Sequence, residues 1–184
     1  MALRHKQVPL GKEVTIIGIE GGKTAPPGKT KEFVVTYLGK CEATVSVTRP
    51  YAYLLPATKM AKAVENLQRH GIVVEELTAD AELPLEVYRV DKITTAAKAF
   101  QEHKLVTVDV TPRQEKRMVK AGTVVVRCAQ PLGTLAAFVL EPQSEDGLCA
   151  WNYFDAGLKQ GGDYPVLRVL ATVPIKVRPL APRE

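Results

Sequence analysis

Alternation of apolar and polar residues is the clearest pattern along the chain. In residues 105–111 valines alternate with threonine and aspartate, which predicts a half-buried strand. Runs rich in β-branched and aromatic residues predict further strands. These are residues 13–19, 33–37, 43–47, 51–55, 72–77, 85–90, 122–127 and 166–173. The run at 122–127 is apolar throughout and is typical of a strand that is buried on both faces.

A period of about 3.6 residues marks two helices. After Pro56, which suits a first helical turn, Met60, Val64 and Leu67 fall on one stripe. Gly71 stands where a left-handed cap ends a helix, so we predict an amphipathic helix of about four turns. The second helix covers residues 132–140 and ends before Pro142. It is apolar almost all round, which predicts that it is buried.

The order of these elements indicates the fold class. Strands do not alternate strictly with helices, so a doubly wound parallel sheet is disfavoured. We predict an α+β fold that is mainly β, with eight or nine strands in a sandwich-like or mixed sheet and two principal helices. Residues 1–30 are predicted to be an irregular segment with one short strand, residues 31–173 a single domain, and residues 174–184 a tail.

Composition and charge narrow the function classes. With 46% hydrophobic and 24% charged residues, the chain has an ordinary globular composition. The net charge of +5 is spread along the sequence, and the densest basic stretch, residues 113–120, contains a glutamate and is predicted to be a solvated loop. This disfavours a nucleic-acid binder. No apolar run has the length of a membrane helix. The opening residues 1–9 include basic residues but no apolar run follows them, so we do not expect a signal peptide. The sequence indicates neither a cellular location nor an oligomeric state.

The sequence supports neither a phosphate-binding loop nor a disulfide framework. Residues 21–24 are Gly-Gly-Lys-Thr, but Ile17 stands where a phosphate-binding loop needs its first glycine. Cys41, Cys128 and Cys149 are too few and too scattered for a disulfide framework, and their odd number favours buried thiols.

Residues for catalysis or metal binding are missing from the sequence. A carboxypeptidase-type zinc site needs His-x-x-Glu, but the residue three positions after His5, His70 and His103 is valine each time. The helical His-Glu-x-x-His motif and the Gly-x-Ser-x-Gly nucleophile elbow are also absent. Paired carboxylates stay open, because acidic residues distant in sequence can meet in a cleft. We therefore assign no catalytic, cofactor-binding or metal residue.

Aromatic residues gather at one place. Three of the eleven aromatic side chains lie at Trp151, Tyr153 and Phe154, next to Asn152. They either cap the core, which we favour, or form a contact surface for a partner domain or a sugar, since Trp and Tyr are enriched at binding hot spots. With Arg49 and Tyr51, these four residues are the candidate interaction surface.

Ordered blocks of sequence carry a resemblance. Six successive blocks of the sequence resemble the region after the catalytic domain in bacterial zinc carboxypeptidases of the carboxypeptidase A-like family, in the same order. These blocks are residues 49–56, 64–72, 86–90, 121–126, 130–142 and 151–154. The resemblance covers about residues 31–169. It implies a parent enzyme that cleaves peptides with zinc-bound water, whose metal ligands lie in a separate upstream domain. No position of this chain matches those ligands.

The leading hypothesis is therefore a non-catalytic accessory or binding module. Such a module would pack against a catalytic domain or hold a peptide or polymer substrate, and would contain no cofactor of its own. The alternatives are a free-standing hydrolase with an unrecognised site and a weak binder of polyanions or nucleic acid.

Overall fold

The structure, a computed structural model, describes residues 1–21, 28–56 and 60–181. The chain divides into two compact units: a smaller one, Ala2–Val45, and a larger one that comprises Met1 and Ser46–Glu184. The predicted domain start at residue 31 lies inside a strand of the smaller unit. Residues 22–24 of the Gly-Gly-Lys-Thr stretch, like residues 57–59 at the predicted start of the first helix, lie outside the described part.

The smaller unit consists of two-stranded antiparallel ribbons. β2 (Glu13–Ile19) pairs with β3 (Thr30–Thr36), so that Ile16 lies opposite Phe33. β1 (Ala2–Val8) neighbours β4 (Lys40–Ser46). The strands β2, β3 and β4 were predicted, whereas β1 was not, because Arg, His and Lys interrupt its apolar pattern.

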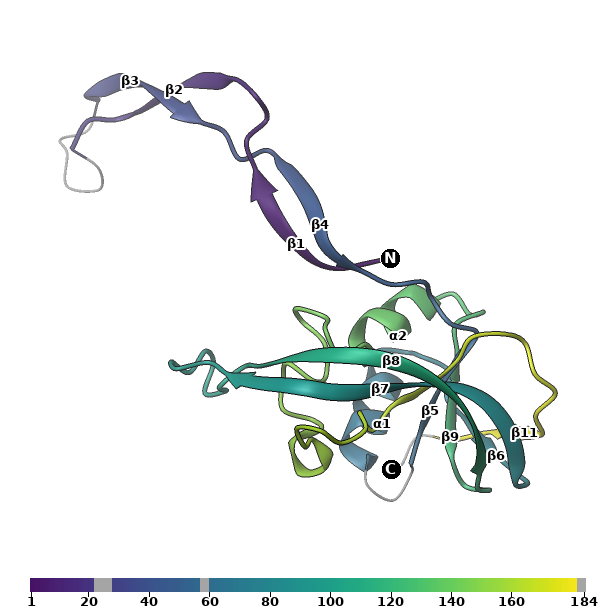
Figure 1. The fold of residues 1–184 in the computed structure, drawn as a ribbon. Helices are drawn as coiled ribbons and strands as arrows, with labels where there is room; N and C mark the ends of the chain where they lie inside the picture. Colours follow the sequence, from purple (N-terminus) through teal and green to yellow (C-terminus); the bar gives the residue numbers. More distant parts are fainter. Residues whose placement is uncertain (22–27, 57–59, 182–184) are drawn as a thin grey trace. The chain divides into compact units, whose positions relative to one another are not determined.

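The larger unit is built on a seven-stranded sheet with the order β11-β6-β9-β5-β10-β7-β8. Its long strands β7 and β8 run side by side in Figure 1. All six neighbouring pairs of this described sheet are antiparallel. In chain order the strands are β5 (Ala52–Leu55), β6 (Glu75–Leu77), β7 (Ala81–Thr95), β8 (Val106–Val119), β9 (Val124–Arg127), β10 (Leu167–Val169) and β11 (Val177–Pro179). The long hairpin of β7 and β8 has a bulge between Val90 and Lys92.

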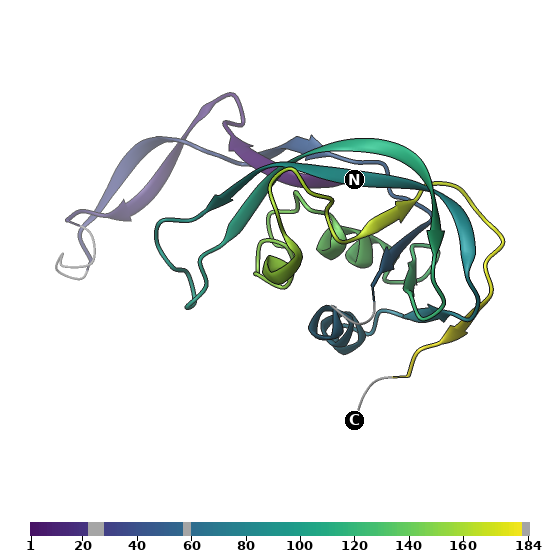
Figure 2. The same ribbon diagram turned by 60° about the horizontal axis from the view of Figure 1, so that its bottom comes forward.

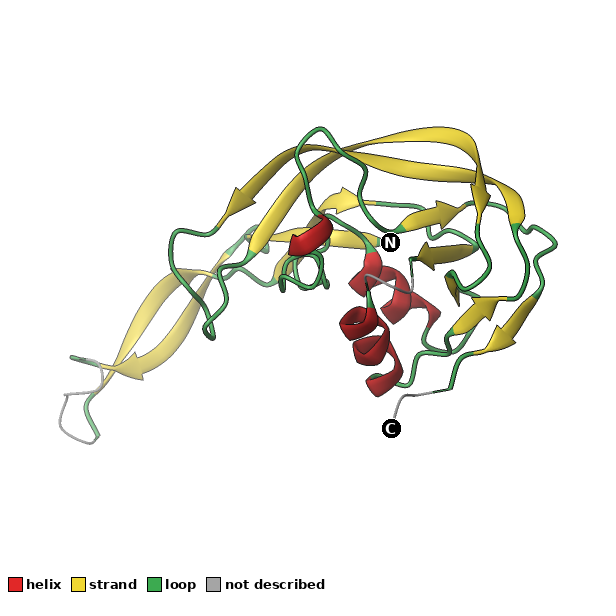
Figure 3. Ribbon diagram, turned by 90° about the horizontal axis from the view of Figure 1, so that it is seen from below, coloured by secondary structure: helices red, strands yellow, loops and turns green. Residues whose placement is uncertain are grey.

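Two helices cover one side of this sheet. α1 (Ala61–Arg69) and α2 (Gly133–Leu140) both lie under the β7–β8 hairpin (Figures 2 and 3). α1 buries Ala63, Val64 and Leu67 and is followed by Gly71 with a φ of 77°, which confirms the predicted cap. With nine residues it is shorter than the four turns predicted, and Met60 precedes it. α2 buries most of its residues, which confirms its predicted position in the core. A one-turn 3-10 helix, η3 (Asp155–Gly157), follows the second helix.

Each face of the sheet has its own core, because successive residues of a strand point to opposite faces. On β5, Tyr53 and Leu55 pack against the helices, whereas Ala52 and Leu54 pack with β7, β9 and the segment at residues 173–177. The predicted class, α+β and mainly β with two principal helices, is confirmed. The described residues form eleven strands rather than the eight or nine expected.

A buried ion pair crosses the helix-covered core. Glu141, which follows α2, is 0% exposed, and its carboxylate lies 3.1 Å from Nε of Arg168 on β10. Tyr53 donates a hydrogen bond of 2.6 Å to the same carboxylate, and Arg168 also contacts Glu86, the Tyr88 hydroxyl and a backbone carbonyl. Burial raises the pKa of Glu141, an effect that Arg168 and Tyr53 partly offset.

Several predicted boundaries differ from the structure. Residues 113–119 belong to β8 rather than to a loop, because the strand pairs along its whole length with β7 and directs its charged side chains to solvent at the sheet edge. Arg113 and Arg117 form ion pairs with Asp163 there. The predicted strands at 72–77 and 166–173 are shorter, at three residues each. The short β11 was not predicted, since it has only three residues and ends at Pro179.

Candidate ligand pocket

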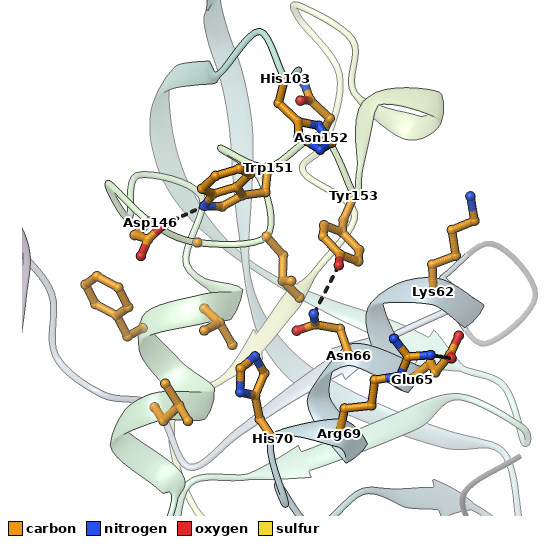
Figure 4. Close-up of a pocket in the computed structure, with 15 residues that line it drawn as sticks. Lys62, Glu65, Asn66, Arg69, His70, His103, Asp146, Trp151, Asn152 and Tyr153 are labelled. Atoms are coloured by element: carbon orange, nitrogen blue, oxygen red, sulfur yellow. Dashed lines mark hydrogen bonds and ion pairs between the residues drawn. The ribbon is translucent and has the colours of Figure 1, made fainter. Parts of the chain in front are cut away.

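A pocket of about 740 Å³ opens in the larger unit, within the usual range of ligand sites. Its walls come from three parts of the chain: α1 with the following His70, α2, and the loop from Asp146 to Tyr153. His103, near the tip of the β7–β8 hairpin, completes the lining. Figure 4 shows the residues that line it.

The loop that carries Trp151 and Tyr153 is fixed at both ends by buried residues. Leu148 is 4% exposed and donates its backbone N–H to Val139 at 2.8 Å. Phe154 is 1% exposed and packs edge to face against Tyr164, with 5.6 Å between the ring centroids. Trp151 and Tyr153 are thus held over the core by neighbours that the core buries.

Asn152 shapes the turn between these aromatic residues. Its φ of 68° lies in the left-handed region, which asparagine tolerates better than most residues. Its amide donates hydrogen bonds of 3.1 Å to the Lys104 carbonyl and to the Asp155 carboxylate. The turn therefore also ties the loop to the base of the β7–β8 connection.

Trp151 is held from several sides. Its indole N–H donates to the Asp146 carboxylate, and its ring system packs against His103 in a T-shaped arrangement, with 5.5 Å between ring centroids. Phe100 lies 6.3 Å away in a tilted arrangement. With its position set in this way, the half-buried indole forms a rigid part of the pocket wall.

The two helices give the pocket walls of opposite character. From α2 come Leu135, Phe138 and Val139, which are all apolar. From α1 and its C-cap come polar residues, namely Lys62, Glu65, Asn66, Arg69 and His70. Tyr153 is joined to the polar wall by a hydrogen bond of 3.0 Å, which the Asn66 amide donates to its hydroxyl (Figure 4).

The candidate interaction surface from the sequence is divided in the structure. Trp151, Asn152 and Tyr153 line the pocket, and Tyr153 is 37% exposed, whereas Phe154 belongs to the core. Arg49 and Tyr51 do not line it. Arg49 donates a hydrogen bond of 3.0 Å to Thr134. The ring of half-buried Tyr51 lies 5.4 Å from the Arg127 guanidinium.

Groups for covalent or metal chemistry are sparse in the described residues. No three His, Cys, Asp or Glu side chains among them are grouped to hold a metal ion. The described lining of the pocket has no serine, threonine or cysteine. Cys128 lies elsewhere, in the core, where burial raises the pKa of its thiol to about 11. What this arrangement offers is an amphipathic binding surface.

No protein-family model, curated protein or solved structure matches this chain. Within the described ranges, no helix is long and apolar enough to cross a membrane.

Proposed function

We propose that this chain is a non-catalytic binding module that holds a peptide-like ligand in the pocket between α1 and α2. The observation that carries the proposal is the pairing of an apolar wall from α2 with a polar wall from α1, beside the fixed indole of Trp151. An extended peptide combines apolar side chains with backbone and side-chain polar groups, so it complements both walls at once.

A peptide suits this site better than a sugar. Sugars stack on a broad, open aromatic face, but Trp151 is half-buried and has His103 and Phe100 against it. The apolar side chains of α2 provide a place for an aliphatic or aromatic side chain instead. A peptide is also the ligand expected from the sequence, where the predicted accessory module holds a peptide or polymer substrate.

The single tryptophan makes the proposal directly testable. Trp151 is the only tryptophan in the chain, so its fluorescence reports on the pocket alone. A random heptapeptide library displayed on phage would be panned against the chain, and enriched peptides would be synthesised and titrated while the tryptophan emission is recorded. We expect saturable emission changes and weaker binding to the Tyr153→Ala variant.

A matched control is available in the smaller unit. Tyr37 is 54% exposed and does not line the pocket, so Tyr37→Ala should bind the peptides like the unmodified chain. Panning that enriches no peptide able to change the Trp151 emission would overturn the proposal. Stoichiometric zinc in the purified chain, together with peptide hydrolysis by it, would overturn its non-catalytic part.

A further inference from the structure

The charges around the pocket are unevenly placed. On the α1 wall, Glu65 is already neutralised by Arg69, whose guanidinium lies 2.6 Å from its carboxylate. Lys62 is exposed and has no acidic partner among the described residues. Its amino group points away from the Glu65–Arg69 pair (Figure 4). The α1 wall therefore has one positive charge, that of Lys62, without a partner among the described residues.

The rest of the described pocket lining places no carboxylate beside the ammonium group of Lys62. The residues that α2 contributes are uncharged. Asp146, the other acidic residue of the lining, accepts the indole N–H of Trp151 on the side of the loop. His103 lies against the same indole. The pocket thus has a cationic edge along α1 and an uncharged apolar wall opposite.

From this distribution we infer that the ligand is an acidic peptide, bound with a side-chain carboxylate at Lys62 and a neighbouring apolar side chain against α2. The inference rests on the proposed function and adds the chemical class of the ligand. A carboxylate at this edge gains a charge-assisted contact, whereas a lysine or arginine there would be repelled. A nucleic-acid strand fits less well, because the α2 wall (Leu135, Phe138 and Val139) is apolar and offers a phosphate no partner.

Two peptides that differ in one charge test whether the pocket prefers an acidic peptide to a neutral one. The first pair of probes is the pentapeptides Gly-Glu-Leu-Phe-Gly and Gly-Gln-Leu-Phe-Gly, each acetylated at the N-terminus and amidated at the C-terminus. The second pair is the tightest-binding peptide from panning and a neutral version of it, in which every Glu is replaced by Gln and every Asp by Asn. Binding is followed by the Trp151 emission at low and at high salt. We expect the acidic member of each pair to bind about threefold to fivefold more tightly at low salt, as for a partly exposed ion pair. High salt should reduce this preference.

Variants of Lys62 identify the group responsible. Lys62→Ala should abolish the preference, Lys62→Arg should keep it, and Lys62→Glu should favour peptides with lysine at that position. Lys116 is exposed on β8 and does not line the pocket, so Lys116→Ala should leave the preference unchanged.

The possible outcomes are distinct. Equal binding of the acidic and neutral peptides, or a preference that persists in Lys62→Ala, would overturn the acidic specificity and leave peptide binding intact. Displacement of the acidic peptide by a single-stranded oligonucleotide at equal concentration would overturn it in favour of a polyanion. No emission change with any peptide would overturn the proposed function as well.

Discussion

Replacement of Arg168 by methionine removes the cation from the buried ion pair of the larger unit. In the variant, the fully buried Glu141 carboxylate would lose its cation and keep only the neutral hydroxyls of Tyr53 and Tyr88 as close side-chain partners among the described residues. Loss of one member of a buried pair costs about 3–5 kcal/mol, because the other charge stays buried without compensation. Domains are stabilised by about 5–15 kcal/mol in total, so the variant should be close to unfolding.

Urea denaturation, followed by circular dichroism and Trp151 emission, measures this cost. With a urea dependence of about 2 kcal/mol per molar, the midpoint should fall by about 1.5–2.5 M. The matched control is Arg178→Met, since Arg178 is an exposed arginine 2.8 Å from Glu76, and such pairs are worth about 1 kcal/mol or less.

The pH dependence follows from the direction of the Glu141 shift. Burial raises the pKa of this carboxyl above its ordinary value, and loss of Arg168 removes the partner that opposes the rise. The ionised carboxylate then costs stability above the ordinary carboxyl pKa, and the cost is complete once the pH exceeds the folded-state pKa. The difference between variant and unmodified chain should therefore shrink as the pH is lowered.

A second substitution tests the reasoning itself. Arg168→Met combined with Glu141→Leu removes both charges and should recover most of the lost stability, because apolar replacements of buried pairs are often neutral. Two results would contradict this role of the Glu141–Arg168 pair: a loss of unfolding free energy in Arg168→Met no larger than in Arg178→Met, or a double variant less stable than Arg168→Met alone.

Two further predictions concern other positions. Cys41 is exposed and Cys128 buried with a thiol pKa of about 11, so a maleimide at neutral pH should label Cys41 rapidly and Cys128 only after unfolding. Mass spectrometry of the labelled peptides measures this. In α2, a Cβ at Gly133 would lie 1.9 Å from the carbonyl oxygen of Cys128, so Gly133→Ala should lose about 3 kcal/mol, the upper end of overpacking costs, despite the better helix propensity of alanine. Thermal denaturation detects this loss.

The cysteine-labelling prediction and the Gly133→Ala prediction each have a control variant in the same chain. The Cys41→Ser variant should show no fast labelling in the native state, and equal labelling rates for Cys41 and Cys128 in the folded chain would contradict the first prediction. Thr134→Ala changes the next, exposed position of the same helix and should cost less than about 1 kcal/mol. A Gly133→Ala variant as stable as Thr134→Ala would contradict the second.

Much of the fold follows from local patterns in the sequence. The strand at 122–127 and the helix at 132–140 were predictable because their apolar runs are buried on nearly every side. The extension of β8 through residues 113–119 could not be predicted in this way, since its charged side chains face solvent and only the pairing with β7 makes the segment a strand. β11 depends in the same way on its pairing with β6.

The pocket was predictable only in part. The aromatic residues around Trp151 indicated a loop that lines the pocket. Lys62 and Asn66 gave no such signal, because any amphipathic helix has a polar face, and only the tertiary contact between Asn66 and Tyr153 shows that this face lines a pocket. His70 and His103 were predicted to be a residue at the end of a helix and a residue before a strand rather than metal ligands, and no pattern in the sequence indicated that both line the pocket.

The order of strands in the sheet also has consequences for how the larger unit folds. β5 lies between β9 and β10, so residue 54 must find partners at residues 125 and 167. Such distant pairings make folding slow, because long loops must close before any contact is gained. During synthesis, β5 and β7 cannot be joined through β10 until residues 167–169 have left the ribosome. Until then the edges of β5 and β7 remain open, and the nascent chain exposes them to aggregation or to chaperones.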